Sequence, residues 1–108
     1  MNLSNKIFEL ISNEAGLADA ATVLTFSDAE NPYCATYQGP NIIHGQVIVA
    51  EDQMLYHALD SDGELRAGAA QIQFANGQMT LDWRWLNGPA AAGRSVWRDL
   101  SPDENGLA

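Results

Sequence analysis

The clearest pattern of hydrophobic and polar positions lies between residues 70 and 85, where two alternating runs flank Asn76-Gly77. Asn-Gly accepts positive φ at both positions and therefore favours the tight type I′ turn that joins antiparallel strands. Because successive strand side chains point to opposite sides, the second run has one apolar face, made of Met79, Leu81, Trp83 and Trp85. The pattern predicts a β-hairpin with one face directed at a core.

The same period of two recurs along most of the chain. Strand-like segments lie at about residues 6–11, 22–28, 33–38, 42–50, 54–59, 65–75, 78–86 and 94–100. The separators are rich in Gly, Pro, Asn and Asp, and most of them are short. Short connections make neighbouring strands antiparallel, because a parallel crossover needs about a dozen residues or more. The fold class is therefore all-β, a single antiparallel up-and-down meander of about eight strands.

A meander of this size has two exposed edges unless the sheet closes on itself. Closure removes both edges and gives a small barrel, with an interior that side chains fill or that holds one small ligand. A half-open, strongly curved sheet is the alternative. We expect one domain over residues 1–108, with a core at about 5–100 and a flexible tail at 101–108.

Two segments near the ends of the chain allow other structures. Leu3, Ile7, Leu10 and Ile11 recur at helical spacing, so an N-terminal helix or short helical turn over residues 3–12 competes with the first strand. Residues 18–21 are also compatible with a short helical turn. Ser101-Pro102-Asp103-Glu104 has the residues of a helix start, yet Asn105-Gly106 follows at once and limits it to one turn.

Charge and composition narrow the classes of binding partner and the cellular location that we expect. The formal charge of −9 disfavours nucleic acid and anionic lipid surfaces, both of which repel an acidic protein. Apolar runs fall short of the ~20 residues that span a bilayer, and no secretory signal is visible at the N-terminus, so we expect a cytoplasmic location. Cys34 is the single cysteine and is expected to behave as a small buried hydrophobe.

An ordered series of short motifs runs through almost the whole chain, about residues 5 to 100. Its elements, in order, are Asn5-Lys6, Phe8, Ser12-Asn13, Thr22, Phe26, Tyr37, Gly39, Gly45, Tyr56-His57, Gly63-Glu64-Leu65 with Gly68, Gly77, Trp83-Arg84-Trp85, Gly88, and Gly93 with Ser95. In this series the chain resembles a family of short bacterial proteins often labelled "N-acetylglutamate synthase". The resemblance implies a small calycin-like barrel of the lipocalin or avidin type.

The activity in that label does not follow from the residues. An acetyltransferase must hold the pyrophosphate of acetyl-CoA, normally with a glycine-rich loop that leads into a helix N-terminus. The sequence supplies neither, so we reject acetyltransferase activity and expect no catalytic residues and no cofactor.

Two other groups of residues resemble catalytic or metal-binding sites, but an ordinary structural role explains each of them better. His57 and His44 lie on neighbouring predicted strands, but two ligands without a third make a poor zinc site. If His57 faces inward, it is more plausibly a core histidine than a catalytic one, and parity allows only one of Tyr56 and His57 to do so. The segment Asp60–Glu64 lacks the spacing of a calcium loop and predicts a hairpin turn. We expect no metal.

The arginines are scarce and all lie in the C-terminal half: Arg66, Arg84, Arg94 and Arg98. A buried arginine needs a carboxylate partner or an anionic ligand, because an unpaired buried charge is costly. Surface pairs with Asp82 or Asp99 are the simpler interpretation. If an arginine does face inward, a carboxylate-bearing molecule is the natural ligand.

The leading functional hypothesis is a barrel that binds a small apolar or amphipathic molecule, with a carboxylate-bearing molecule as one variant. Aromatic side chains suit the walls of such a pocket, and the candidate binding residues are Tyr37, Tyr56, His57, Trp83, Trp85, Trp97, Arg84 and Arg98. The alternative is a solid barrel that acts as an interaction module, for example a homodimer, through outer residues such as Leu55, Leu59 or Leu86. An enzyme that uses His57 is the least supported hypothesis.

Overall fold

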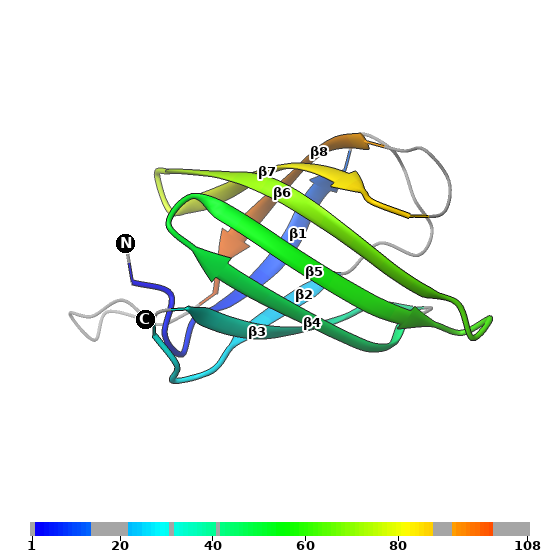
Figure 1. The fold of residues 1–108 in the computed structure, drawn as a ribbon. Helices are drawn as coiled ribbons and strands as arrows, with labels where there is room; N and C mark the ends of the chain where they lie inside the picture. Colours follow the sequence, from blue (N-terminus) through cyan, green and yellow to red (C-terminus); the bar gives the residue numbers. More distant parts are fainter. Residues whose placement is uncertain (1, 14–21, 31, 41, 88–91, 101–108) are drawn as a thin grey trace.

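The computed structural model describes residues 2–13, 22–30, 32–40, 42–87 and 92–100, and its strands form a closed antiparallel barrel in sequence order (Figure 1). The eight strands are β1 (Ile7–Asn13), β2 (Val23–Phe26), β3 (Tyr33–Gln38), β4 (Ile42–Ala50), β5 (Gln53–Asp60), β6 (Leu65–Ala75), β7 (Gln78–Trp85) and β8 (Ala92–Asp99). The predicted meander and its closure are both confirmed. Residues 18–21 and 101–108, where a helical turn and a tail were expected, lie outside the described residues.

The Asn76-Gly77 hairpin has the predicted geometry. Asn76 and Gly77 have φ values of 55° and 76°, and Ala75 pairs with Gln78 across the turn. Positive φ at both central residues is the requirement of a type I′ turn. On β7, the apolar face turns inward: Met79, Leu81 and Trp83 are buried.

Pairing between β1 and β8 closes the barrel. Glu9 lies opposite Arg98 and Leu10 opposite Trp97, so neither terminal strand of the meander is left as an edge. The alternative of an N-terminal helix over residues 3–12 is wrong, because the chain runs as a strand from Ile7. A shift in register between Leu10 and Ser12 lets Asn13 pair with inward-facing Ser95.

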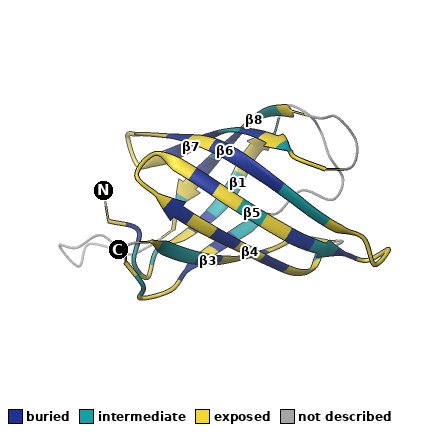
Figure 2. Ribbon diagram, in the orientation of Figure 1, coloured by how far each residue is buried: buried dark blue, intermediate teal, exposed yellow. Residues whose placement is uncertain are grey.

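The core fills the barrel toward the end that carries the Asn76-Gly77 turn. Figure 2 shows buried and exposed positions alternating along β4 and β5, as expected for strands with one face inward. Leu3, Val49 and Met79 are at most 1% exposed, and Phe8 meets Phe26 edge to face with ring centroids 6.0 Å apart. Burial of each such side chain contributes about 1.5–3 kcal/mol to the free energy of unfolding.

The described residues contain no helix, and therefore none that is long and apolar enough to cross a membrane.

Candidate binding site

Four aromatic side chains form a continuous row inside the barrel, toward the end opposite the Asn76-Gly77 turn. Tyr37 meets Tyr56 with ring centroids 6.4 Å apart, Tyr56 meets Trp85 at 5.4 Å, and Trp85 meets Trp83 at 6.5 Å. Each contact is edge to face, the arrangement that aromatic quadrupoles favour. Tyr37 and Trp83 are buried, whereas Tyr56 and Trp85 are half-buried. We call these four residues the aromatic row.

Two glycines make room for the tyrosines of the row. A Cβ at Gly45 would lie 2.7 Å from the Tyr37 ring, and a Cβ at Gly68 would lie 2.3 Å from the Tyr56 ring. Each tyrosine therefore lies flat over the backbone of the next strand. The space that the missing side chain of Gly68 leaves is taken by the Tyr56 ring.

Some of the inward polar side-chain atoms have a hydrogen-bond partner, and others have none. Tyr56 Oη donates to the Arg84 carbonyl oxygen at 3.0 Å, and Trp97 Nε1 donates to Ser95 Oγ at 2.8 Å. Tyr37 Oη and Asn13 Oδ1 are buried and have no hydrogen-bond partner among the residues that the structure describes. Buried polar atoms normally have partners, so these two are the groups most in need of one.

Burial keeps the tyrosine hydroxyls protonated. It raises the pKa of Tyr37, and the neighbouring Tyr56 adds to that increase. Burial also raises the pKa of Tyr56, against the smaller lowering effects of the Arg84 charge and of the bond to the Arg84 carbonyl. Both side chains are therefore neutral at physiological pH, and the Tyr37 hydroxyl is able to donate and to accept.

An ion pair lies where β5 turns into β6. Asp60 is 5% exposed and accepts hydrogen bonds from the backbone N–H groups of Asp62 and Glu64, each at 3.0 Å. Arg66 Nε donates to Asp60 Oδ2 at 3.2 Å, and Arg66 Nη2 donates to Glu64 Oε2 at 2.8 Å. The segment is a hairpin turn, with Gly63 at a φ of 82°, as the sequence predicted.

These bonds lower the pKa of the Asp60 carboxyl. The largest effect comes from the Glu64 N–H, and the Arg66 guanidinium and the Asp62 N–H add to it, while desolvation opposes them. Inward placement of Arg66 was not expected. Its parity with Gly68 and Ala70, two positions apart along one strand, is the signal that identifies it.

Three predicted binding residues lie on the outer surface instead of in the interior. His57 is exposed because its neighbours Tyr56 and Ala58 take the inward positions of β5. Arg84 is exposed between Trp83 and Trp85 for the same reason. Arg98 points outward and pairs with Glu9 across the β1–β8 seam. Strand parity thus removes these residues from the interior, and with them the suggestion that an inward Arg84 or Arg98 selects a carboxylate.

The other predicted residues face inward, although they do not all meet. Tyr37, Tyr56, Trp83 and Trp85 form the aromatic row. Trp97 is 4% exposed and packs in the core, where its cross-strand neighbours are Leu10 and Met79. The unpaired oxygen of Asn13 was missed, because the β1 register shift that turns it inward has no clear signal in the sequence.

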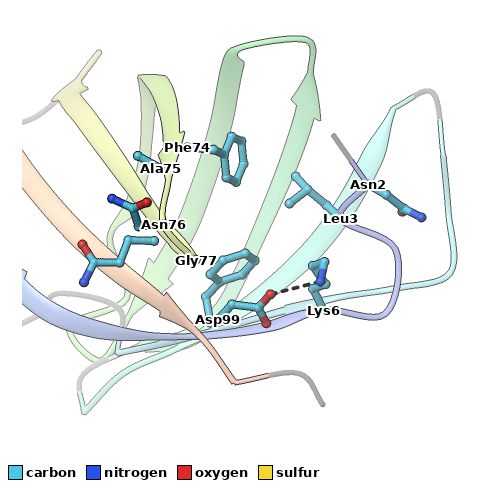
Figure 3. A pocket seen from close by; sticks show the side chains of 10 residues that line it. Asn2, Leu3, Lys6, Phe74, Ala75, Asn76, Gly77 and Asp99 are labelled. Carbon is cyan, nitrogen blue, oxygen red and sulfur yellow. Dashed lines mark hydrogen bonds and ion pairs between the residues drawn. The ribbon is translucent and has the colours of Figure 1, made fainter. Parts of the chain in front are cut away.

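A separate hollow of about 440 Å³ lies at the opposite end of the barrel. Figure 3 shows Leu3 and Phe74 facing each other across it, with the ion pair between Lys6 and Asp99 (3.0 Å) at its rim. None of the predicted binding residues lines it.

The described residues bring together no group of three or more metal-ligating side chains. His44 and His57 lie near each other on the outer face, with ring centroids 6.4 Å apart, and no hydrogen bond joins His57 to another described side chain.

Comparison with known proteins identifies the family. A family model described as "Avidin-like protein" matches residues 1–100 of the chain. The chain belongs to the avidin-like family. This agrees with the closed eight-stranded meander and with the calycin-like fold that the motif series implied. No curated protein and no solved structure matches the chain.

Proposed function

We propose that this avidin-like barrel binds a small apolar or amphipathic molecule at the aromatic row. The observation that carries the proposal is the pair of buried, unpartnered polar atoms, Tyr37 Oη and Asn13 Oδ1. A buried polar atom without a partner costs about 1–3 kcal/mol. A ligand that supplies the missing hydrogen bonds recovers this energy, which gives the site affinity and orientation.

The chemistry of the site defines the ligand class. Four aromatic rings favour a flat or apolar body, because rigid rings bury area at little entropic cost. Asn13 Oδ1 accepts only, so the ligand must present an N–H or O–H donor there. Arg66 is already held by Asp60 and Glu64, so it adds little attraction for a carboxylate. The best match is a neutral molecule with an amide-like or hydroxyl group on an apolar body.

Binding of N-phenyl-1-naphthylamine tests the proposal. This neutral fluorophore has an apolar aromatic body and one N–H donor, and its emission rises in apolar surroundings. We expect saturable binding, quenching of tryptophan emission, and loss of at least about tenfold in affinity for Trp85→Ala, since loss of one stacking wall costs about 1.4 kcal/mol or more.

Two control variants locate the probe. Leu55→Ala removes an exposed outer side chain, and Phe74→Ala removes the exposed ring of the opposite hollow. Both are expected to bind the probe as the natural chain does. Equal affinity of Trp85→Ala and the natural chain, or no saturable binding, would exclude the proposed site.

A further inference from the structure

The two histidines of the chain lie side by side on the outer face of the barrel. His44 is on β4 and His57 is on β5, and the sequence contains no other histidine. Their ring centroids are 6.4 Å apart, with the ring planes inclined by 43°. The register of β4 and β5 brings them together, because Gln46 lies directly opposite His57 and His44 is two positions away from Gln46 along β4. We call His44 and His57 the histidine pair.

The spacing of the histidine pair suits one shared metal ion. Two imidazoles whose nitrogens lie about 2.0–2.1 Å from one metal have ring centroids about 5–6 Å apart. Both side chains of the pair are exposed, so their rings rotate freely about the side-chain bonds. The paired strands meanwhile fix the two backbone positions relative to each other. A small rotation of the rings is therefore enough to direct one nitrogen of each toward a common point.

The surface around the pair favours one class of metal. The strands β3 to β6 contain a single acidic residue, Asp60, and its side chain is buried. Magnesium and calcium ions need several oxygen ligands, carboxylates among them, so the outer face of these strands suits neither ion. Imidazole nitrogen suits copper, nickel and zinc.

We propose that the histidine pair binds a copper(II) ion. Among the divalent ions that imidazole suits, copper(II) binds most tightly, and its tetragonal geometry accepts nitrogen and oxygen ligands together. Gln46 lies on the same outer face, opposite His57, and offers an amide oxygen as a third ligand, while water fills the remaining positions. The chain's charge of −9 raises the local concentration of cations.

The proposal departs from the expectation of no metal, which rested on zinc. Zinc sites normally take three or four protein ligands in a tetrahedral arrangement, and the histidine pair supplies two. Copper(II) needs fewer protein ligands when two imidazoles act as a chelate. Since one sheet holds both rings, binding by the first makes binding by the second intramolecular.

Calorimetric titration of the full chain with copper(II) chloride, in a glycine buffer that suppresses weak binding, tests the proposal. We expect one tightly bound ion per chain, and about a hundredfold loss of affinity for His44→Gln or His57→Gln, because each removes the chelate. The matched control combines His57→Gln with Gln53→His. It keeps the composition and leaves two exposed histidines on the same face, but position 53 lies opposite Ala50. This control is expected to bind copper as weakly as His57→Gln alone.

A measurement on the natural chain protects the test against misfolded variants. Copper(II) is paramagnetic, so a substoichiometric amount is expected to broaden the imidazole C–H proton signals of both histidines together in the nuclear magnetic resonance spectrum. Cys34→Ser is expected to bind copper as the natural chain does, which separates the histidine pair from the thiol.

Four results would overturn the proposal. The first is broadening of only one histidine, and the second is unchanged copper affinity in His44→Gln or His57→Gln. The third is tight binding by the control with the relocated histidine, since any two histidines would then be sufficient. The fourth is displacement of copper by millimolar magnesium or its loss in Cys34→Ser, because carboxylates or the thiol would then hold the ion.

Discussion

The ring of Tyr56 occupies the space that a side chain at Gly68 would need. A Cβ there would lie 2.3 Å from the ring carbons, and the ring is held in place by the hydrogen bond from Tyr56 Oη to the Arg84 carbonyl oxygen at 3.0 Å. Gly68→Ala must therefore displace the ring and break this bond. We expect it to lower the free energy of unfolding by about 1–3 kcal/mol, measured by urea denaturation.

A double-mutant cycle identifies the cause of that loss. If the clash with Tyr56 is responsible, Gly68→Ala costs much less when Tyr56 is already alanine, so the two effects are strongly non-additive. Additive effects would show that Gly68 is required for another reason.

Tyr37→Phe is expected to have opposite effects on stability and binding. The substitution removes a buried hydroxyl that has no partner in the described structure, so the free protein becomes more stable by about 1 kcal/mol. The same hydroxyl is proposed to bind ligand, so the affinity for N-phenyl-1-naphthylamine is expected to fall. Calorimetry and fluorescence titration measure the two quantities.

Tyr56→Phe serves as the control for Tyr37→Phe. Its hydroxyl has a partner in Arg84, so its removal is expected to destabilise the protein by about 0.5–1.5 kcal/mol. If both phenylalanine variants change stability in the same direction, the Tyr37 hydroxyl has a partner in solution.

Asp60 is expected to contribute to acid sensitivity. Its pKa is lower in the folded chain than in the unfolded chain, chiefly because of the Glu64 N–H. Such a group stabilises the fold above its unfolded pKa of about 3.9, and the contribution is lost as the pH falls below that value toward the folded pKa. Asp60→Asn is therefore expected to flatten the acid limb of a stability–pH curve, measured by urea denaturation at a series of pH values.

Arg98→Gln is expected to have little effect on either stability or binding. Arg98 is exposed and paired with Glu9 on the outer surface, and exposed pairs contribute about 0–1 kcal/mol. Probe affinity should match that of the natural chain. A large loss of affinity would mean that Arg98 reaches the ligand after all.

The sequence predicted the fold well because period-two patterning and turn residues are local signals. Neighbouring residues alone were enough to predict the Asn76-Gly77 turn and the inward face of β7. The orientation of β5 was harder to assign: parity allowed only one of Tyr56 and His57 to face inward without deciding which, and the structure leaves His57 on the exposed face. Asn13 turns inward through a register shift, which no local pattern predicts, whereas the parity of Arg66 with Gly68 was a local signal of its inward position.

The seam between β1 and β8 also governs how the barrel forms. Phe8 lies opposite Asp99 and Glu9 opposite Arg98, contacts that span nearly the whole described chain. Loop-closure entropy makes such distant pairings late and slow, whereas the hairpins from β3 to β7 need only short loops. We therefore expect assembly to end at this seam, and until it closes, the hydrogen-bonding edges of β1 and β8 are open to pairing with other chains.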